Sequence, residues 1–277
     1  KKVVLSCLIF AGIAFVSLAQ GNGTGKNDRP NIIYILADDL GYGELGIYGQ
    51  QKIETPNIDA LAKSGMIFTQ HYSGAPVCAP ARYMLLTGTH AGHAYIRGND
   101  EWSERGDVWN YRATVLDSTL EGQRPIPSST VLLPKKLKEV GYRTGIVGKW
   151  GLGAPHTDAI PTKMGFDFFF GYNCQRQAHT YYPVHLYHNE QRFYLGNDTI
   201  APSTKLAQGV AIEDPLSYKD YTLTTYAPDV MFDQLLTFIG DEQGKESPFF
   251  LYWATPLPHN PIQAPQRWVD YYKAKFG

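Results

Sequence analysis

Short apolar runs alternate with amphipathic segments along much of this chain. Asn31–Ala37 is a continuous apolar run of strand length, and such runs are typical of strands that are buried on both faces. Arg143–Gly148 and the aromatic-rich run Phe249–Ala254 also predict strands. We expect a further strand at Met66–Gln70. Together these runs predict a central sheet.

Amphipathic segments lie between the predicted strands. Thr55 and Pro56 predict a helix start, with Thr55 as the cap and Pro56 in the first position, and the helix should end near Gly65. One face of this helix carries three apolar residues: Ile58, Leu61 and Ala62. Thr130–Val140, closed by Gly141, predicts a second helix.

Another helix is predicted over Asp229–Ile239, with four candidates for the core: Val230, Leu235, Leu236 and Ile239. Strands that alternate with helices indicate an α/β fold, in which a mostly parallel sheet has helices on both faces. Residues 98–128 and 174–227 are predicted to be long irregular stretches, and insertions of this kind in a compact fold tend to be functional loops.

The first residues have the pattern of a secretory signal. Lys1 and Lys2 are basic, Val3–Leu18 is almost wholly apolar, and small residues precede a cleavage site after Ala19. A membrane anchor is the alternative, but the run is short for a spanning helix. We therefore expect a signal peptide at residues 1–19, an exposed leader at 20–30, and an exported protein, periplasmic or secreted.

Composition and charge exclude some functions. The net charge is −1 and no basic run occurs, which argues against nucleic-acid binding. The hydrophobic content of 43% suits a sizeable globular core. Outside the predicted signal peptide the chain has two cysteines, Cys78 and Cys174. An exported protein can pair them in a disulfide.

Cys78 lies in an unusual setting. Pro80 fits the first turn of a helix and Gly88 fits its end, so Cys78 lies at or near the helix N-terminus. Backbone N–H groups and the helix dipole favour an anion there. Arg82 follows one turn along the same face and adds a fixed positive charge. A reactive thiol, a disulfide and a buried small side chain all fit this position.

Polar residues follow each of three predicted strands. Asp38 and Asp39 follow the first strand and are oxygen ligands suited to Ca²⁺ or Mg²⁺, although a capped turn also fits them. Lys149 follows the second strand, where it either reaches solvent or offsets an anion. His259 follows the third strand, in a loop with three prolines. Ligands of open α/β sheets bind at this edge.

These segments resemble the sulfatase family. The run from Cys78 through Pro80 and Arg82 to Leu86-Thr87-Gly88 is similar to the family's Cys-x-Pro-x-Arg signature. Three more segments match in family order, and the resemblance covers nearly all of residues 30–265: Pro30–Gly43, Gly148-Lys149-Trp150 and Pro258-His259. The resemblance implies an alkaline-phosphatase-like fold and the hydrolysis of aryl or carbohydrate sulfate esters.

The resemblance also implies roles for single residues. A sulfatase-maturing enzyme, such as a formylglycine-generating enzyme, would oxidise Cys78 to formylglycine, whose hydrate is the nucleophile. Asp38, Asp39 and the modified Cys78 would bind Ca²⁺, with Mg²⁺ as a second possibility. Arg82 would hold the modified residue and Lys149 would contact the sulfate.

Two histidines would face the substrate. His259 would contact the sulfate ester and protonate the leaving oxygen, because a pKa near neutrality suits that task. His179 and Gln175 lie in a tyrosine-rich stretch that resembles a substrate-side loop of some bacterial arylsulfatase-like proteins. A rim loop held by aromatic packing fits that stretch as well.

The chain departs from the family pattern at several places. Ala81 stands where Ser is frequent, and Gly151 stands where the family often has a His that contacts the formylglycine hydrate. No Asp-Asn-Gly occurs, and Asn197-Asp198 has the reverse order. We expect residues 20–277 to be the N-terminal part of a catalytic domain whose C-terminal part is absent, and to be inactive alone.

Two other functions compete with sulfatase activity. A phosphoester or phosphonate hydrolase of the same superfamily would use the same nucleophile. A non-catalytic exported glycan-binding protein would instead pair Cys78 with Cys174. The sequence does not indicate which sulfated small molecule or glycan is the substrate, or the oligomeric state.

Overall fold

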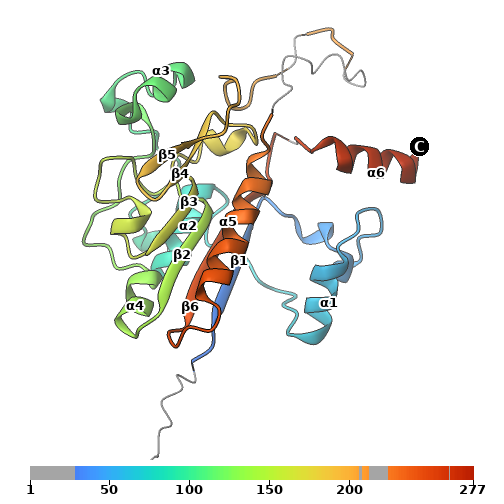
Figure 1. The fold of residues 1–277 in the computed structure, drawn as a ribbon, viewed down its shortest axis with the longest axis horizontal. Coiled ribbons are helices and arrows are strands. Elements are labelled where there is room, and N and C mark those ends of the chain that lie inside the picture. Colours follow the sequence, from blue (N-terminus) through green and yellow to red (C-terminus); the bar gives the residue numbers. More distant parts are fainter. Residues whose placement is uncertain (1–28, 206–207, 212–223, 262) are drawn as a thin grey trace, which may run out of the picture.

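A computed structural model describes residues 29–205, 208–211, 224–261 and 263–277. Its strands form one sheet in the order β1-β6-β2-β3-β4-β5 (Figure 1). The neighbours among β1, β6, β2 and β3 run parallel, and β4 and β5 add an antiparallel hairpin. The strand bounds are β1 Ile32–Asp38, β2 Arg143–Lys149, β3 Phe168–Tyr172, β4 His185–His188, β5 Gln191–Tyr194 and β6 Phe249–Pro258. The predicted mostly parallel sheet is confirmed.

Helices cover both faces of the sheet, as predicted. The bounds are α1 Pro56–Ser64, α2 Cys78–Thr87, α3 Tyr111–Leu116, α4 Leu133–Glu139, α5 Ala227–Glu242 and α6 Gln266–Phe276. Figure 1 shows α5 across one face, with α2 and α4 on the other. Short 3₁₀ turns connect several of these elements.

Each face has its own apolar core, because successive side chains of a buried strand point to opposite faces. Ile146 and Phe250 join a cluster that includes α2 residues such as Leu86. Val147 and Leu251, their neighbours in sequence, join a second cluster under α5. The α5 residues in that cluster repeat at helical spacing: Ala227, Met231, Leu235 and Phe238.

Some expectations about single elements were wrong. Met66–Gln70 forms no strand and is exposed, since no neighbouring strand pairs with it. The apolar face predicted for α1 is not in the core: Ile58 is 46% and Leu61 is 68% exposed. Thr55 is the N-cap residue of α1, but its side chain makes no capping bond. It accepts from the backbone N–H of Gly46 instead.

The observed bounds of two helices differ from the predicted ones by a few residues. The helix predicted over Thr130–Val140 begins at Leu133. The one predicted over Asp229–Ile239 is longer at both ends. Leu236 of this helix, expected in the core, is 50% exposed. Val230 and Ile239 are only partly buried against the core.

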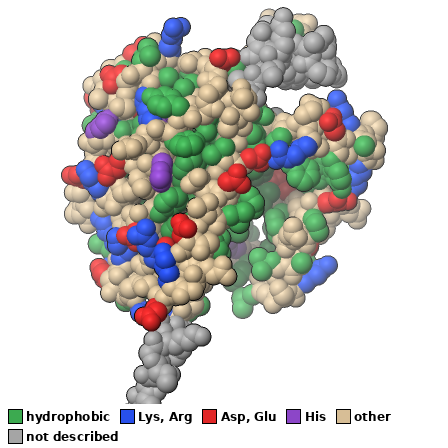
Figure 2. Space-filling model, viewed as in Figure 1, with side chains coloured by type: hydrophobic (Ala, Val, Ile, Leu, Met, Phe, Trp, Pro, Cys, Tyr) green, Lys and Arg blue, Asp and Glu red, His purple; other side chains and the backbone are tan. Residues whose placement is uncertain are grey.

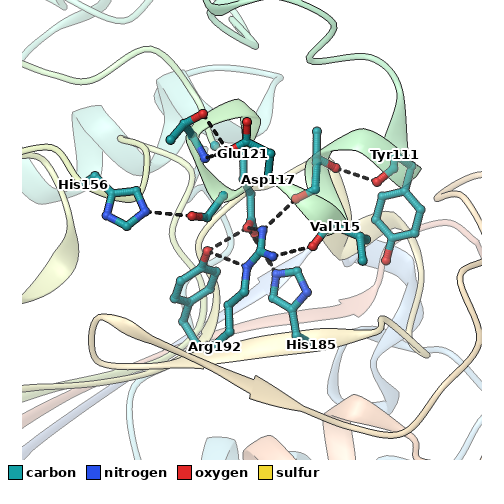
Figure 3. Close-up of polar contacts among 12 residues, drawn as sticks. Tyr111, Val115, Asp117, Glu121, His156, His185 and Arg192 are labelled. Atoms are coloured by element: carbon teal, nitrogen blue, oxygen red, sulfur yellow. Dashed lines mark hydrogen bonds and ion pairs between the residues drawn. The ribbon is translucent and has the colours of Figure 1, made fainter.

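The stretches expected to be irregular hold ordered structure. Residues 98–128 contain α3, and 174–227 contain the β4–β5 hairpin. Figure 3 shows Glu121 between the hairpin residues His185 and Arg192. Burial raises the pKa of Glu121, but hydrogen bonding to His185 and the charges of His185 and Arg192 outweigh burial, so the net pKa is lowered. This buried ion cluster connects residues 98–128 to the β4–β5 hairpin.

Within the described ranges, no helix is both long and apolar enough to cross a membrane. The predicted signal peptide, residues 1–19, lies outside the described residues.

Candidate active site

Three parallel strands end at one edge of the sheet and position the candidate residues there. Asp38 is the last residue of β1, and Lys149 is the last residue of β2. His259 follows the end of β6. Strands β2 and β6 approach closely at Gly148, where a Cβ atom would lie 2.1 Å from the carbonyl oxygen of Ala254. Glycine is therefore required just before Lys149.

Helix α2 brings Cys78 to the same edge. Cys78 is the first residue of the helix, as predicted, and Val77 is the N-cap. The Asn99 side chain accepts a hydrogen bond from the backbone N–H of Ala79, at 3.1 Å, and satisfies one of the free donors of the first turn. Arg82 lies on the same face, one turn along.

The centre of the site is a contact cluster around the Cys78 sulfur. Lys149 Nζ lies 3.2 Å from Cys78 Sγ and 2.6 Å from Asp38 Oδ2. Asp38 Oδ1 lies 3.8 Å from the same sulfur. Arg82 lies 3.4 Å from Asp38 Oδ2 and donates to the backbone oxygen of Lys149 at 2.9 Å. Side chains from β1, β2 and α2 therefore meet at Cys78.

The charges in this cluster are buried. Arg82 is 2% exposed and Lys149 is fully buried. Burial raises the pKa of the Asp38 carboxyl, but the charges of Arg82 and Lys149 outweigh burial and hold the pKa below its usual value. A buried cluster that holds two basic side chains and an ionised carboxylate is suited to an anionic substrate beside a cation.

A second group of side chains lies beside the cluster. His259 Nε2 is 3.2 Å from Asp39 Oδ2, and Nδ1 is 2.5 Å from the backbone oxygen of Asn260. Both ring nitrogens thus face oxygen atoms, and these two contacts hold the His259 ring at the end of β6.

The His179 ring stacks on the His259 ring, with centroids 4.4 Å apart and planes 4° from parallel. Burial, followed by the positive charges of Lys149 and His259, lowers the pKa of His179 to about 4. His179 is therefore neutral at physiological pH, and its buried Nε2 has no hydrogen-bond partner among the described residues. This atom is available to a ligand.

All the residues that the sequence analysis selected lie together: Cys78, Arg82, Lys149, Asp38, Asp39, His259 and His179. Sequence reasoning missed Asn99 at the start of α2. It also missed Tyr181, whose hydroxyl donates to the backbone oxygens of Pro256 and His259 and holds the His259 loop. The only signal for Tyr181 was its place in the tyrosine-rich stretch.

Cys78 and Cys174 are both free thiols in the structure. Cys78 is half-buried, whereas Cys174 is buried and contacts Glu101 and Gln123. Burial raises the pKa of Cys174 to about 11. The disulfide between the two cysteines, which the glycan-binding alternative required, is not formed.

The residues expected to bind a metal fit a hard cation in part. Asp38 and Asp39 place two adjacent carboxylates beside Cys78, and carboxylate oxygens are ligands that Ca²⁺ and Mg²⁺ prefer. Among the described residues no group of three His, Cys, Asp or Glu residues could hold a metal ion. Asn197, from the reversed Asp-Asn pair, clamps the backbone at Pro183 and Thr225 instead.

Comparison with known proteins agrees with this arrangement. Residues 30–277 match the family model described as Sulfatase. N-acetylgalactosamine-6-sulfatase of Homo sapiens is 36% identical over 243 residues, which cover 87% of this chain and 42% of that protein. Arylsulfatase of Klebsiella aerogenes is 29% identical over 94% of this chain and 49% of that protein. The chain spans less than half the length of these relatives.

Solved structures show the same likeness. The crystal structure of Ps i-CgsB in complex with k-i-k-neocarrahexaose superposes with a TM-score of 0.64 at 27% identity, and covers 90% of this chain and 49% of that one. The putative sulfatase yidJ from Bacteroides fragilis, at 22% identity and a TM-score of 0.62, covers 88% of this chain and 47% of that one and shares the fold. The alkaline-phosphatase-like fold predicted from the sequence is confirmed.

Proposed function

The chain belongs to the sulfatase family, and on that premise we propose that the protein hydrolyses sulfate esters at the cluster around Cys78. The observation that carries the proposal is the contact of the Cys78 sulfur with Lys149 and Asp38, in a cluster that also holds the buried Arg82. A thiol among fixed cations at a helix N-terminus is well placed to become, after modification, a nucleophile that faces an anion.

The proposal includes two groups that the chain would acquire. A formylglycine made from Cys78 by a maturing enzyme would supply a hydrated aldehyde, in which one hydroxyl attacks sulfur and the other later expels sulfate. A Ca²⁺ ion, held by Asp38, Asp39 and residue 78, would supply positive charge beside the sulfate. Mg²⁺ is the alternative ion for the same oxygen ligands.

The remaining roles belong to side chains already in place. Lys149 and Arg82 offset the negative charge of the sulfate group, and their burial strengthens that effect. His259, beside Asp39 at the end of β6, donates a proton to the departing ester oxygen. His179, neutral and stacked on His259, contacts the substrate through its unpaired Nε2.

The substrate class that we propose is a sulfated glycan or a small aryl sulfate. The names of two similar proteins support it: one is an N-acetylgalactosamine-6-sulfatase and the other an arylsulfatase. The k-i-k-neocarrahexaose bound to Ps i-CgsB also favours a carbohydrate. Together with the apolar N-terminal run, this class favours an exported enzyme that is periplasmic or secreted.

The test is made on the full-length protein, produced with a sulfatase-maturing enzyme. Mass spectrometry of the peptide that contains Cys78 should find an aldehyde, and kcat/KM should be higher for 4-nitrophenyl sulfate than for 4-nitrophenyl phosphate. Cys78→Ala should abolish turnover, whereas Cys174→Ala should leave an active enzyme because Cys174 lies outside the cluster.

Three results would contradict the proposal. A preference for the phosphate ester would favour a phosphoester hydrolase, and a disulfide between Cys78 and Cys174 would favour a non-catalytic binding protein. An unmodified Cys78 in a fully active enzyme would remove formylglycine from the mechanism.

A further inference from the structure

Gly151 lies two residues beyond Lys149, and a neighbouring side chain fills the space next to it. The φ angle of Gly151 is +79°, in the left-handed region that favours glycine. A Cβ atom on Gly151 would lie 3.0 Å from Cβ and 3.0 Å from Oε1 of Gln175. Gln175 thus occupies the position that a side chain at 151 would otherwise take.

The amide of Gln175 is buried without a partner. The residue is 2% exposed, and neither Oε1 nor Nε2 has a hydrogen-bond partner among the described residues. Buried amides are nearly always hydrogen-bonded, because an unmade bond leaves the cost of desolvation uncompensated. The Gln175 amide lies against Gly151, two residues from Lys149, and both of its polar atoms are available to a ligand.

Hydrogen bonds hold the backbone around Gln175, and burial restricts its side chain. Gln123 Oε1 accepts a hydrogen bond from the backbone N–H of Gln175 at 2.9 Å, and Gln123 Nε2 donates to Glu101 at 2.9 Å. The backbone N–H of Gly151 donates to Asn173, which joins the end of β2 to this loop. Such preorganisation is what a binding group at an active site requires.

The same loop leads directly to the catalytic edge. The backbone N–H of Ala178 donates to the backbone oxygen of Gln175 at 3.2 Å and closes a turn. His179 comes next, and the charge of Lys149 helps to lower its pKa. Gln175 is therefore held between the end of β2, which carries Lys149, and the histidine pair.

On the basis of the sulfate-ester hydrolysis proposed above, we propose that Gln175 contacts the substrate, with its Nε2 donating a hydrogen bond to a sulfate oxygen. A neutral, buried amide donor would add to the charges of Lys149 and Arg82 without introducing another buried ion. The glycine at 151 leaves room for this side chain.

The test compares three variants of the full-length, matured protein. Gln175→Leu removes both polar atoms, and we expect kcat/KM for 4-nitrophenyl sulfate to fall about 10- to 100-fold. Gln175→Glu keeps the size and the acceptor but replaces the donor by a negative charge, so we expect a larger loss than in Gln175→Leu. Gln191→Leu, at an exposed position of β5 in the β4–β5 hairpin, is the control, and we expect near wild-type kinetics because Gln191 lies outside the cluster around Cys78.

A binding measurement separates this inference from the proposed function. Inorganic sulfate is titrated by calorimetry into wild-type protein and each variant, after circular dichroism has shown that the variants fold. Weaker sulfate binding in both Gln175 variants supports the contact, even if the wild type turns over no ester and the proposed function fails. Unchanged sulfate binding in Gln175→Leu would overturn the inference, as would Gln175→Glu being as active as Gln175→Leu.

Discussion

The Lys149 amine is fully buried between the Asp38 carboxylate and the Cys78 sulfur. Lys149→Met keeps most of the side-chain volume but removes the charge, so the proposed sulfate group would lose a buried cation beside Cys78. We expect kcat for an aryl sulfate to fall about 100-fold or more, measured on matured full-length protein. Lys138→Met is the control, because Lys138 pairs with Asp167 at the surface. We expect it to lower the free energy of unfolding by less than about 1 kcal/mol.

His179 makes stability depend on pH. The folded state keeps this imidazole neutral down to about pH 4, because burial and the charges of Lys149 and His259 lower its pKa, whereas the unfolded chain protonates it near pH 6.5. The unfolded state thus binds more protons between these values, so the stabilising contribution is present above about pH 6.5 and is lost as the pH falls towards 4.

His179→Asn should therefore reduce the loss of stability on acidification. Urea unfolding at about pH 7 and about pH 5 measures the difference, which should not exceed about 1.4 kcal/mol per pH unit. An identical pH dependence in the variant and the wild type would contradict this assignment.

The sequence predicted which side chains meet at the site better than it predicted their finer contacts. Asp38, Asp39, Lys149 and His259 end or follow a strand and Cys78 begins a helix, and elementary rules for parallel sheets bring such positions to one edge. The rules did not identify Asn99, Tyr181 or the orientation of Gln175. Those contacts depend on loops whose paths are set by long-range packing.

At the level of secondary structure, β2 and β6 must approach closely for the site to form. Gly148→Ala would place a methyl group about 2.1 Å from the backbone oxygen of Ala254. We expect the free energy of unfolding to fall by about 3 kcal/mol or more, measured by urea denaturation. The control is Gly244→Ala, since Gly244 also has a positive φ, +78°, but a methyl group there would have no neighbouring atom within 4 Å. It should cost about 1–2 kcal/mol.

Strands were predicted correctly where an apolar run is buried on both faces of the sheet. The prediction failed where strand formation depends on a neighbouring strand to pair with. Met66–Gln70 has a strand-like composition but no partner, so it forms no strand and stays exposed. Conversely, β4 and β5 are short and polar, and exist because β3 offers its edge and the Glu121 cluster fixes the hairpin. Pairing partners are not visible in a local pattern.

For the whole molecule, we expect the number of metal ligands to limit activity. Calcium takes six to eight oxygen ligands, whereas the described residues offer two adjacent carboxylates and no group of three candidate ligands. We expect a polypeptide of residues 20–277 to show no turnover of 4-nitrophenyl sulfate, compared with full-length protein at equal formylglycine content. Turnover at a similar rate would show that the carboxylates present are sufficient.

The position of β1 in the sheet has a consequence for how the site is lost. In the described part of the chain β1 pairs only with β6, and Ile33 and Ile35 on its α5 side are 48% and 54% exposed. Figure 2 shows hydrophobic side chains gathered between α5 and the part of the molecule that carries α1 and α6.

A strand held on one side opens at lower free energy than the strands inside the sheet. Amide hydrogen exchange of residues 29–277 should therefore be faster in Ile33–Ala37 than in Ile146–Lys149 of β2, and equal protection of the two segments would contradict this. Asp38 and Asp39 detach when β1 opens, whereas Cys78 and Lys149 remain on elements that stay folded. Local fraying of one strand would thus take apart the cluster around Cys78 before the rest of the described structure unfolds.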